Sequence, residues 1–365
     1  MKPLRILWQV TGSALLLVSV SACTPPLTHY RTDVPALQLS VLGQPPASDG
    51  RVRFREIYCG VLSSEPSSST TNCDEALVRL SDEPPARSSQ APLPAFDPSM
   101  HILFVGGAFG ECFRDIASPF PADFAKLSGL GYRMRLVSVD GRSSSTRNAG
   151  QIADAVREEQ VGPGEKLVLM GYSKGTPDIL QFLVRNPELA TRVDAVVSFA
   201  GAVNGSPLGE AYAGLYAMVA GIDLKSCGPG DHGVLDSLRV KVRTQWLARH
   251  RLPANVRYFS VSSFTESDQT ARLMFITKGD LNRVEALNDG QTIFYDQLVP
   301  GSVLLGYAHG DHWAVVLPLQ EKWPYWGGNS AKTHYPRDLL FEAVVLYVGE
   351  ALGQEGRPAE RRGAR

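Results

Sequence analysis

The chain has 365 residues, with 36 basic and 37 acidic side chains and a formal net charge of −1. This balance excludes a strongly charged disordered chain. It also argues against a nucleic-acid partner, because a nucleic-acid binder needs a basic surface to meet the phosphates. Hydrophobic residues make up 44% of the chain, so we expect a folded globular protein of one or two domains.

The N-terminus has the features of a bacterial export signal. Lys2 and Arg5 precede a short apolar run, 14–20, which is too short to cross a bilayer as a helix but suits a signal peptide. The small residues before Cys23 resemble a lipobox, which implies that 1–22 is removed and that the Cys23 thiol is acylated. We therefore expect a periplasm-facing protein with a palmitate-type lipid anchor in the membrane. Residue 24 is Thr rather than aspartate, which by resemblance to bacterial lipoprotein sorting signals favours the outer membrane. The alternative is an ordinary signal peptide with an incidental cysteine.

The remaining cysteines are an even number in a chain that we expect to be exported, which predicts two disulfides. Of the three possible pairings we favour Cys59 with Cys73, because these residues bracket one Ser-rich loop, and Cys112 with Cys227. The alternative is four unpaired buried thiols.

The N-terminal part of the chain is less regular than the rest. Residues 23–50 are rich in proline and predict a tether. Two strands are expected at 51–59 and 76–80. The folded domain is expected to extend over 51–352, and the arginine-rich tail, 353–365, is expected to be disordered.

From His101 onward, apolar runs alternate with helical stretches, which predicts βα units, an α/β fold and a mostly parallel sheet flanked by helices. The runs 167–170 and 193–199 are almost continuously apolar, as central parallel strands should be. We expect strands at 101–105, 134–139, 167–170, 193–199, 256–261 and 302–307. We expect helices at 122–130, 147–160, 173–185, 234–249 and 336–352.

A G-x-S-x-G motif, Gly171–Gly175, lies between one of these strands and the helix that follows. A sharp strand–helix turn of this kind lifts the hydroxyl of its central serine above the sheet edge. Ser173 is therefore the candidate nucleophile. The alternative is a tight turn without chemistry.

A serine hydroxyl needs a base to activate it. The strand at 302–307 leads to two histidines, and we favour His312 because it precedes an apolar run at a strand–helix junction. His309, three residues earlier, is the competing base.

The acid that orients the base is predicted at the turn Asn288-Asp289-Gly290, which lies 23 residues before His312. This spacing leaves room for one loop and one strand between acid and base. The order Ser173, Asp289, His312 matches the nucleophile–acid–base order of a known class of hydrolases. The competing acids are Asp268, Asp296 and Asp311.

Acyl transfer also needs hydrogen-bond donors for the oxyanion. The backbone N–H of Lys174, next to the nucleophile, is one candidate. A second is expected from the glycine-rich loop 106–110, at Ala108 or Phe109. We expect the side chain of Lys174 to be solvated and to have no catalytic role.

With these motifs the chain resembles the α/β-hydrolase superfamily, in particular bacterial lipases and esterases, over about residues 100–350. The segment 193–208 is similar to the lipase segment that opens into a lid, and the insertion before Asn-Asp-Gly is also similar. The resemblance implies an α/β-hydrolase fold, a possible helical cap at 206–250 and Asp289 in preference to Asp268. Thr176 departs from the lipase pattern, which often has glycine there, and the oxyanion loop lacks the common His-Gly pair.

The expected function is hydrolysis of carboxylic esters through an acyl-enzyme, with an acyl ester or lipid as substrate. The alternatives are a thioesterase or amidase with the same triad, or a hydrolase-like binding module of the cell envelope. No cofactor or metal is expected, since His232 and His334 are isolated. Side chains of the cap could line an acyl pocket: Tyr212, Leu215, Tyr216 and Met218. The oligomeric state is left open.

Overall fold

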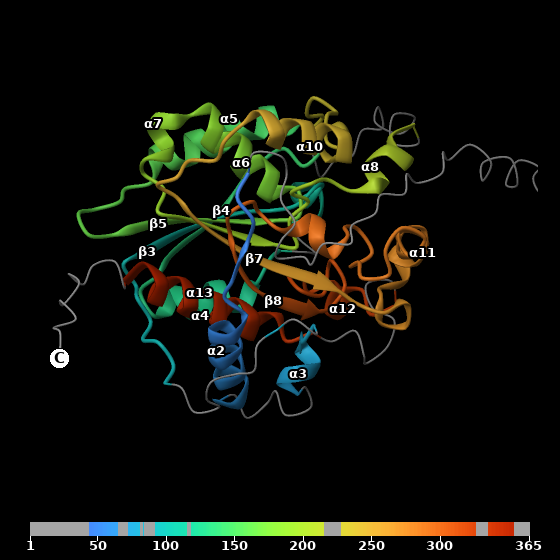
Figure 1. Ribbon diagram of the computed structural model, residues 1–365. Helices are drawn as coiled ribbons and strands as arrows, with labels where there is room; N and C mark the ends of the chain where they lie inside the picture. The colour runs from blue at the N-terminus through green and yellow to red at the C-terminus, as the bar shows by residue number, and fades with distance from the viewer. Residues whose placement is uncertain are drawn as a thin grey trace, which may run out of the picture.

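The computed structural model describes residues 44–64, 72–80, 83, 92–114, 118–214, 228–325 and 335–353. Across these ranges the central feature is an eight-stranded sheet in the order β1-β8-β7-β6-β5-β3-β4, with β2 paired to β8 (Figure 1). The pairs are parallel except β2–β8. The strands are β1 (Ser48–Asp49), β2 (Leu77–Val78), β3 (Met100–Val105), β4 (Arg133–Val137), β5 (Lys166–Tyr172), β6 (Ala195–Phe199), β7 (Arg257–Phe264) and β8 (Val303–His309). The predicted α/β class is confirmed, with strand boundaries shifted by a few residues.

Helices cover both faces of the sheet. In Figure 1, α5, α6, α7 and α10 lie on one side, and α2, α4 and α13 lie on the other. The helices are α2 (Arg51–Ser64), α3 (Cys73–Ala76), α4 (Pro121–Gly129), α5 (Ser145–Glu158), α6 (Gly175–Arg185), α7 (Pro187–Ala190), α8 (Pro207–Ala211), α10 (Val240–Arg249), α11 (Phe275–Leu281), α12 (Leu319–Lys322) and α13 (Arg337–Gly353). Short 3-10 turns are η4 (Gly110–Phe113), η5 (Asp236–Leu238), η6 (Ser267–Gln269), η7 (Arg272–Met274) and η8 (Phe294–Gln297).

The core lies on both faces of the sheet because successive strand residues point to opposite sides. In β3, Ile102 and Phe104 pack into the cluster beneath α2, α4 and α13. Leu103 and Val105 pack into the cluster beneath α5 and α6. A strand buried on both faces reads as a continuous apolar run, which is why the sequence located these strands well.

The strand predicted at 51–59 is wrong: this segment is part of helix α2. Its buried apolar residues are Phe54, Ile57, Tyr58, Val61 and Leu62, a spacing of three and four that marks one helix face. The predicted strand ended at residue 59, before the last two positions of that face. Only Leu77–Val78 of the second predicted strand, 76–80, is extended.

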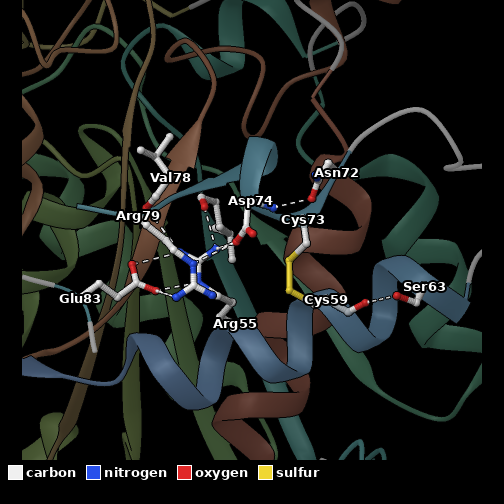
Figure 2. Close-up of a disulfide and its surroundings, with 10 residues drawn as sticks. Arg55, Cys59, Ser63, Asn72, Cys73, Asp74, Val78, Arg79 and Glu83 are labelled. Carbon is white, nitrogen blue, oxygen red and sulfur yellow. Dashed lines mark hydrogen bonds and ion pairs between the residues drawn. A yellow bond between two sulfur atoms is a disulfide. The ribbon is translucent and has the colours of Figure 1, made fainter. Parts of the chain in front are cut away.

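Arg51 and Arg55 of α2 are buried, and these charged residues obscured the helical pattern of the sequence. Arg55 forms a bidentate pair with Glu83 at 2.6 and 3.0 Å and donates to the Leu77 carbonyl at 2.7 Å. Figure 2 shows this cluster beside the disulfide Cys59–Cys73, which ties α2 to α3. The first predicted disulfide is therefore present.

The second predicted disulfide stays a prediction. Cys112 is disulfide-bonded, but Cys227 lies outside the described residues. Cys23, the predicted signal segment 1–22 and residues 354–365 also lie outside them. Within the range 23–50 predicted as a tether, Ser48 and Asp49 form β1 and pair with Val303 and Leu304, so that end of the range belongs to the sheet.

Candidate active site

Ser173 occupies a sharp turn between β5 and α6. Its φ of 53° is in the left-handed region, which non-glycine residues adopt rarely. The turn is held by backbone bonds: the Ser173 N–H donates to the Phe199 carbonyl at 3.1 Å, and its own carbonyl accepts from Ala202 at 3.1 Å. A strained backbone conformation that surrounding hydrogen bonds hold in place is typical of a functional position.

The turn has no room for a side chain at the two flanking glycines, Gly171 and Gly175. A Cβ on Gly171 would lie 2.7 Å from backbone atoms of Thr176, and a Cβ on Gly175 would lie 2.3 Å from the Val105 carbonyl oxygen. Thr176, the departure from the lipase pattern, is accommodated by hydrogen bonds from its hydroxyl to the Gly171 carbonyl at 3.0 Å and to Ser198 at 3.1 Å.

Three predicted site residues, Ser173, His312 and Asp289, are linked by hydrogen bonds between their side chains. His312 Nε2 lies 2.8 Å from Ser173 Oγ, and His312 Nδ1 lies 2.7 Å from Asp289 Oδ2. The side chains of Asp289 and His312 are almost completely buried, while Ser173 is 9% exposed. This arrangement presents a hydroxyl to a base and the base to an acid.

Asp289 is held as a carboxylate by its surroundings. Burial alone would raise its pKa, but the charge and hydrogen bond of His312, with N–H donors from Thr292 and Gln291, keep that pKa below its usual value. Ser263 and Gln297 also donate to Oδ2, at 3.0 and 3.2 Å. The carboxylate can therefore fix the ring orientation of the histidine.

The competing candidates lie elsewhere. His309 contacts the Glu75 carbonyl at 3.0 Å and Glu266 at 2.5 Å, not Ser173. Asp268 lies on the exposed turn η6, and Asp296 accepts from Asn204 at 3.2 Å.

Asp311, the remaining alternative acid, supports the turn that carries His312. It accepts from the N–H groups of Trp313 at 3.0 Å and Ala314 at 2.8 Å, and from Ala271 at 2.7 Å. Burial raises the pKa of Asp311 to about 6.

The candidate oxyanion loop, 106–110, approaches Ser173 closely. A Cβ on Gly107 would lie 3.0 Å from Ser173 Cβ, which shows how closely the backbone approaches. The Phe109 N–H donates to the Gly141 carbonyl at 2.8 Å, so Phe109 is not free to serve as the donor. Of the two predicted alternatives Ala108 remains, beside Lys174.

The Lys174 side chain is not solvated, contrary to expectation. It is 1% exposed and its Nζ donates to both carboxylate oxygens of Asp178, at 2.7 and 2.8 Å. Asn148 of α5 donates to the same carboxylate at 2.7 Å. Burial lowers the pKa of Lys174, and the Asp178 carboxylate opposes that shift. The sequence spacing of four residues on α6 could have indicated this pair.

Tyr172 is a site residue that sequence reasoning did not select. Its hydroxyl donates to the His312 carbonyl at 2.8 Å, and the centroids of the two rings lie 5.1 Å apart. Its position as the second residue of the G-x-S-x-G motif was the available signal. It supports the position of His312 through this backbone contact and the packing of the two rings.

The described chain is similar over almost its whole length to the solved structure of a metagenomic carboxyl esterase. The two share 34% sequence identity with a TM-score of 0.77, over 92% of this chain and 99% of that chain. The chain belongs to the carboxyl esterase family of α/β-hydrolases. No family model and no curated protein matches it.

More distant structures share the fold of this esterase family. The mature lipase of Bacillus licheniformis is 18% identical with a TM-score of 0.50, over 70% of this chain and 96% of that one. The lipase of Staphylococcus hyicus is 11% identical with a TM-score of 0.50, over 71% and 97%.

In this member of the family a cavity of about 490 Å³ opens at Ser173 and His312. Its wall is mostly apolar and includes Phe109, Leu136, Val139, Leu208, Tyr212 and Trp323. Leu208 and Tyr212 come from the predicted cap, 206–250, whereas Leu215, Tyr216 and Met218 lie outside the described residues. A cavity of this size and lining suits a small apolar group.

Among the described residues there is no group of three or more His, Cys, Asp or Glu side chains that could hold a metal ion. His232 lies 3.5 Å from Arg142, and His334 is outside the described ranges. No helix in the described part of the chain is long and apolar enough to cross a membrane.

Proposed function

We propose that this protein is a serine esterase that cleaves carboxylic esters through an acyl-enzyme. The observation that carries the proposal is the hydrogen-bonded series Ser173–His312–Asp289 at the mouth of an apolar cavity. Membership of the carboxyl esterase family supports ester hydrolysis.

In the proposed reaction, Ser173 Oγ attacks the ester carbonyl while His312 Nε2 accepts the serine proton, over the observed 2.8 Å contact. The C–O bond of the tetrahedral intermediate then breaks, and His312 returns the proton to the departing alcohol. Water then attacks the acyl carbonyl while the same imidazole accepts its proton; the bond between the acyl carbon and Ser173 Oγ breaks, and His312 returns the proton to Oγ as the carboxylic acid leaves. Asp289 stabilises the imidazolium that forms twice in this cycle.

The oxyanion of each tetrahedral intermediate needs N–H donors that are already in place. We propose the backbone N–H groups of Lys174 and Ala108 for this role. The tight packing of Gly107 against Ser173 supports the loop's part in it. The bidentate pair between Lys174 and Asp178 supports a rigid first turn of α6.

The test is hydrolysis of a series of p-nitrophenyl esters of increasing acyl length by the purified chain. We expect turnover of apolar acyl esters, with a loss of about three orders of magnitude or more in Ser173→Ala. Faster cleavage of acyl thioesters or anilides would move the protein to a thioesterase or amidase. No turnover of any of these by folded wild-type protein would support the binding module instead.

We also propose that Cys23 is acylated and anchors the enzyme in the bacterial outer membrane, facing the periplasm. The proposal rests on the sequence pattern before Cys23. Cys23→Ser should move the protein from the membrane fraction to the soluble fraction. Unchanged membrane partition, with an unmodified mature N-terminus, would refute it.

A further inference from the structure

A buried lysine lies behind the acid of the triad. Lys278 is on α11 and is 2% exposed. Its Nζ donates to the Asn288 carbonyl at 2.8 Å and to the Ala286 carbonyl at 3.1 Å. Asn288 is the residue directly before Asp289 in the chain. The ammonium group therefore bonds to the backbone that carries the triad acid.

The two carbonyls do not need this lysine to satisfy them. The Asn288 carbonyl also accepts from the Thr265 N–H at 3.1 Å, and the Ala286 carbonyl also accepts from the Asn288 N–H at 3.0 Å. Buried backbone acceptors are normally satisfied by one partner. Burying an ammonium group costs free energy. Because other donors already satisfy these carbonyls, we infer that the buried lysine has a role besides packing.

We propose that Lys278 is a positioning residue of the esterase: its charged ammonium holds the loop 286–289 so that Asp289 meets His312. This inference rests on the proposed function. In this proposal Lys278 contacts neither the substrate nor the reacting atoms. Lys278 acts only through the loop 286–289.

A change of pH can remove the charge of Lys278 and so test its role. Burial lowers its pKa to about 8, while the carboxylates of Asp289, Glu266 and Glu285 oppose the shift. His309 adds a further titratable group on this side, because it contacts Glu266. Above about pH 8 the neutral amine still donates hydrogen bonds, but these are no longer charge-assisted and are weaker.

The experiment measures the rate at which a fluorophosphonate labels Ser173 between pH 6 and pH 10, in wild type, Lys278→Met and Lys278→Arg. For wild type we expect the labelling rate to fall at alkaline pH, with a midpoint near pH 8. Lys278→Met should label about tenfold to a hundredfold more slowly, because a small misplacement of catalytic groups has effects of this size. It should also show no fall near pH 8.

Lys278→Arg should remove the alkaline fall while keeping most of the wild-type rate, since arginine stays charged throughout this range. The matched control is Lys241→Met, the loss of an exposed lysine on α10, which should leave the profile unchanged. A fall near pH 8 that persists in both Lys278 variants would overturn the proposal.

A second variant keeps the test valid if the buried substitutions fail to fold. Glu266→Gln removes a negative charge that favours the protonated lysine, and Glu266 itself is exposed. It should move the alkaline fall to lower pH, and an unmoved midpoint would count against the proposal. A wild-type protein that does not label at any pH would refute the proposed function itself, whereas labelling without the Lys278 dependence would refute only this inference.

Discussion

Asp289 and His312 are joined at two points. Their side chains meet at 2.7 Å, and the backbone N–H of His312 donates to the backbone carbonyl of Asp289 at 2.8 Å. The loop after β8 and the Asn-Asp-Gly turn are therefore held together by the main chain as well as by the side-chain contact. This double connection fixes where the imidazole stands before any substrate arrives, which reduces the reorganisation needed during reaction.

The base is the first element to test. His312→Ala should lower kcat/KM for a short acyl ester by about four to six orders of magnitude, because Ser173 then has no proton acceptor. The measurement is steady-state hydrolysis by protein whose folding is verified by circular dichroism.

His309→Ala is the matched control for the base. This histidine contacts Glu75 and Glu266 rather than the nucleophile, so its loss should change activity by no more than about threefold. A larger loss for His309→Ala than for His312→Ala would move the base to His309.

A second prediction concerns stability. Asp123 on α4 is buried beside Asp338 and Glu342 of α13, and burial together with these two charges raises its pKa to about 9. An unfolded aspartate releases its proton near pH 4. Between about pH 4 and pH 9 the folded state therefore binds more protons than the unfolded state, and the free energy of unfolding falls as pH rises, by at most about 1.4 kcal/mol per pH unit.

Asp123→Asn keeps the shape of the protonated carboxyl group without its titration. The variant should be more stable than wild type at pH 8 in urea unfolding, and the difference should shrink as pH falls toward 4. Asp154→Asn removes an exposed acid on α5, whose side chain is 69% exposed, and should change little. A pH-independent difference between Asp123→Asn and wild type would show that Asp123 is not protonated in the fold.

The disulfide supplies a third prediction. Cys59 and Cys73 are 14 residues apart, and closing a loop of about 15 residues stabilises a fold by roughly 3 kcal/mol in the chain-entropy model. The double variant Cys59→Ala/Cys73→Ala should lose about this much unfolding free energy. Its kcat should stay near the wild-type value, because the pair lies outside the triad. Equal stability of variant and wild type in chemical denaturation would contradict this.

Much of the fold followed from local pattern. The central parallel strands are buried on both faces, and Leu167–Met170 shows the continuous apolar run that this position produces. The triad was also accessible, because the turn after β5 needs its glycines, and the Asn-Asp-Gly turn precedes the last central strand. The structure brings the side chains of Asp289 and His312 together, and their catalytic roles stay predictions.

Other features depended on contacts between segments far apart in the chain. Helix α2 was misread because buried arginines interrupt its apolar face, and the partners that satisfy Arg55 lie far along the chain, among them Glu83, 28 residues away. Phe109 could not be separated from Ala108 without knowing that the Gly141 carbonyl takes its N–H. No sequence motif marks Lys278, because its hydrogen-bond partners are backbone carbonyls of a loop.

Mass-mapped labelling with a serine-reactive phosphonate tests most directly whether Ser173 is the nucleophile. We predict stoichiometric labelling at Ser173 of the folded wild-type protein. Ser173→Ala should fold and remain unlabelled. Folded wild-type protein that takes up no label across neutral pH, or takes it up at another residue, would contradict the account.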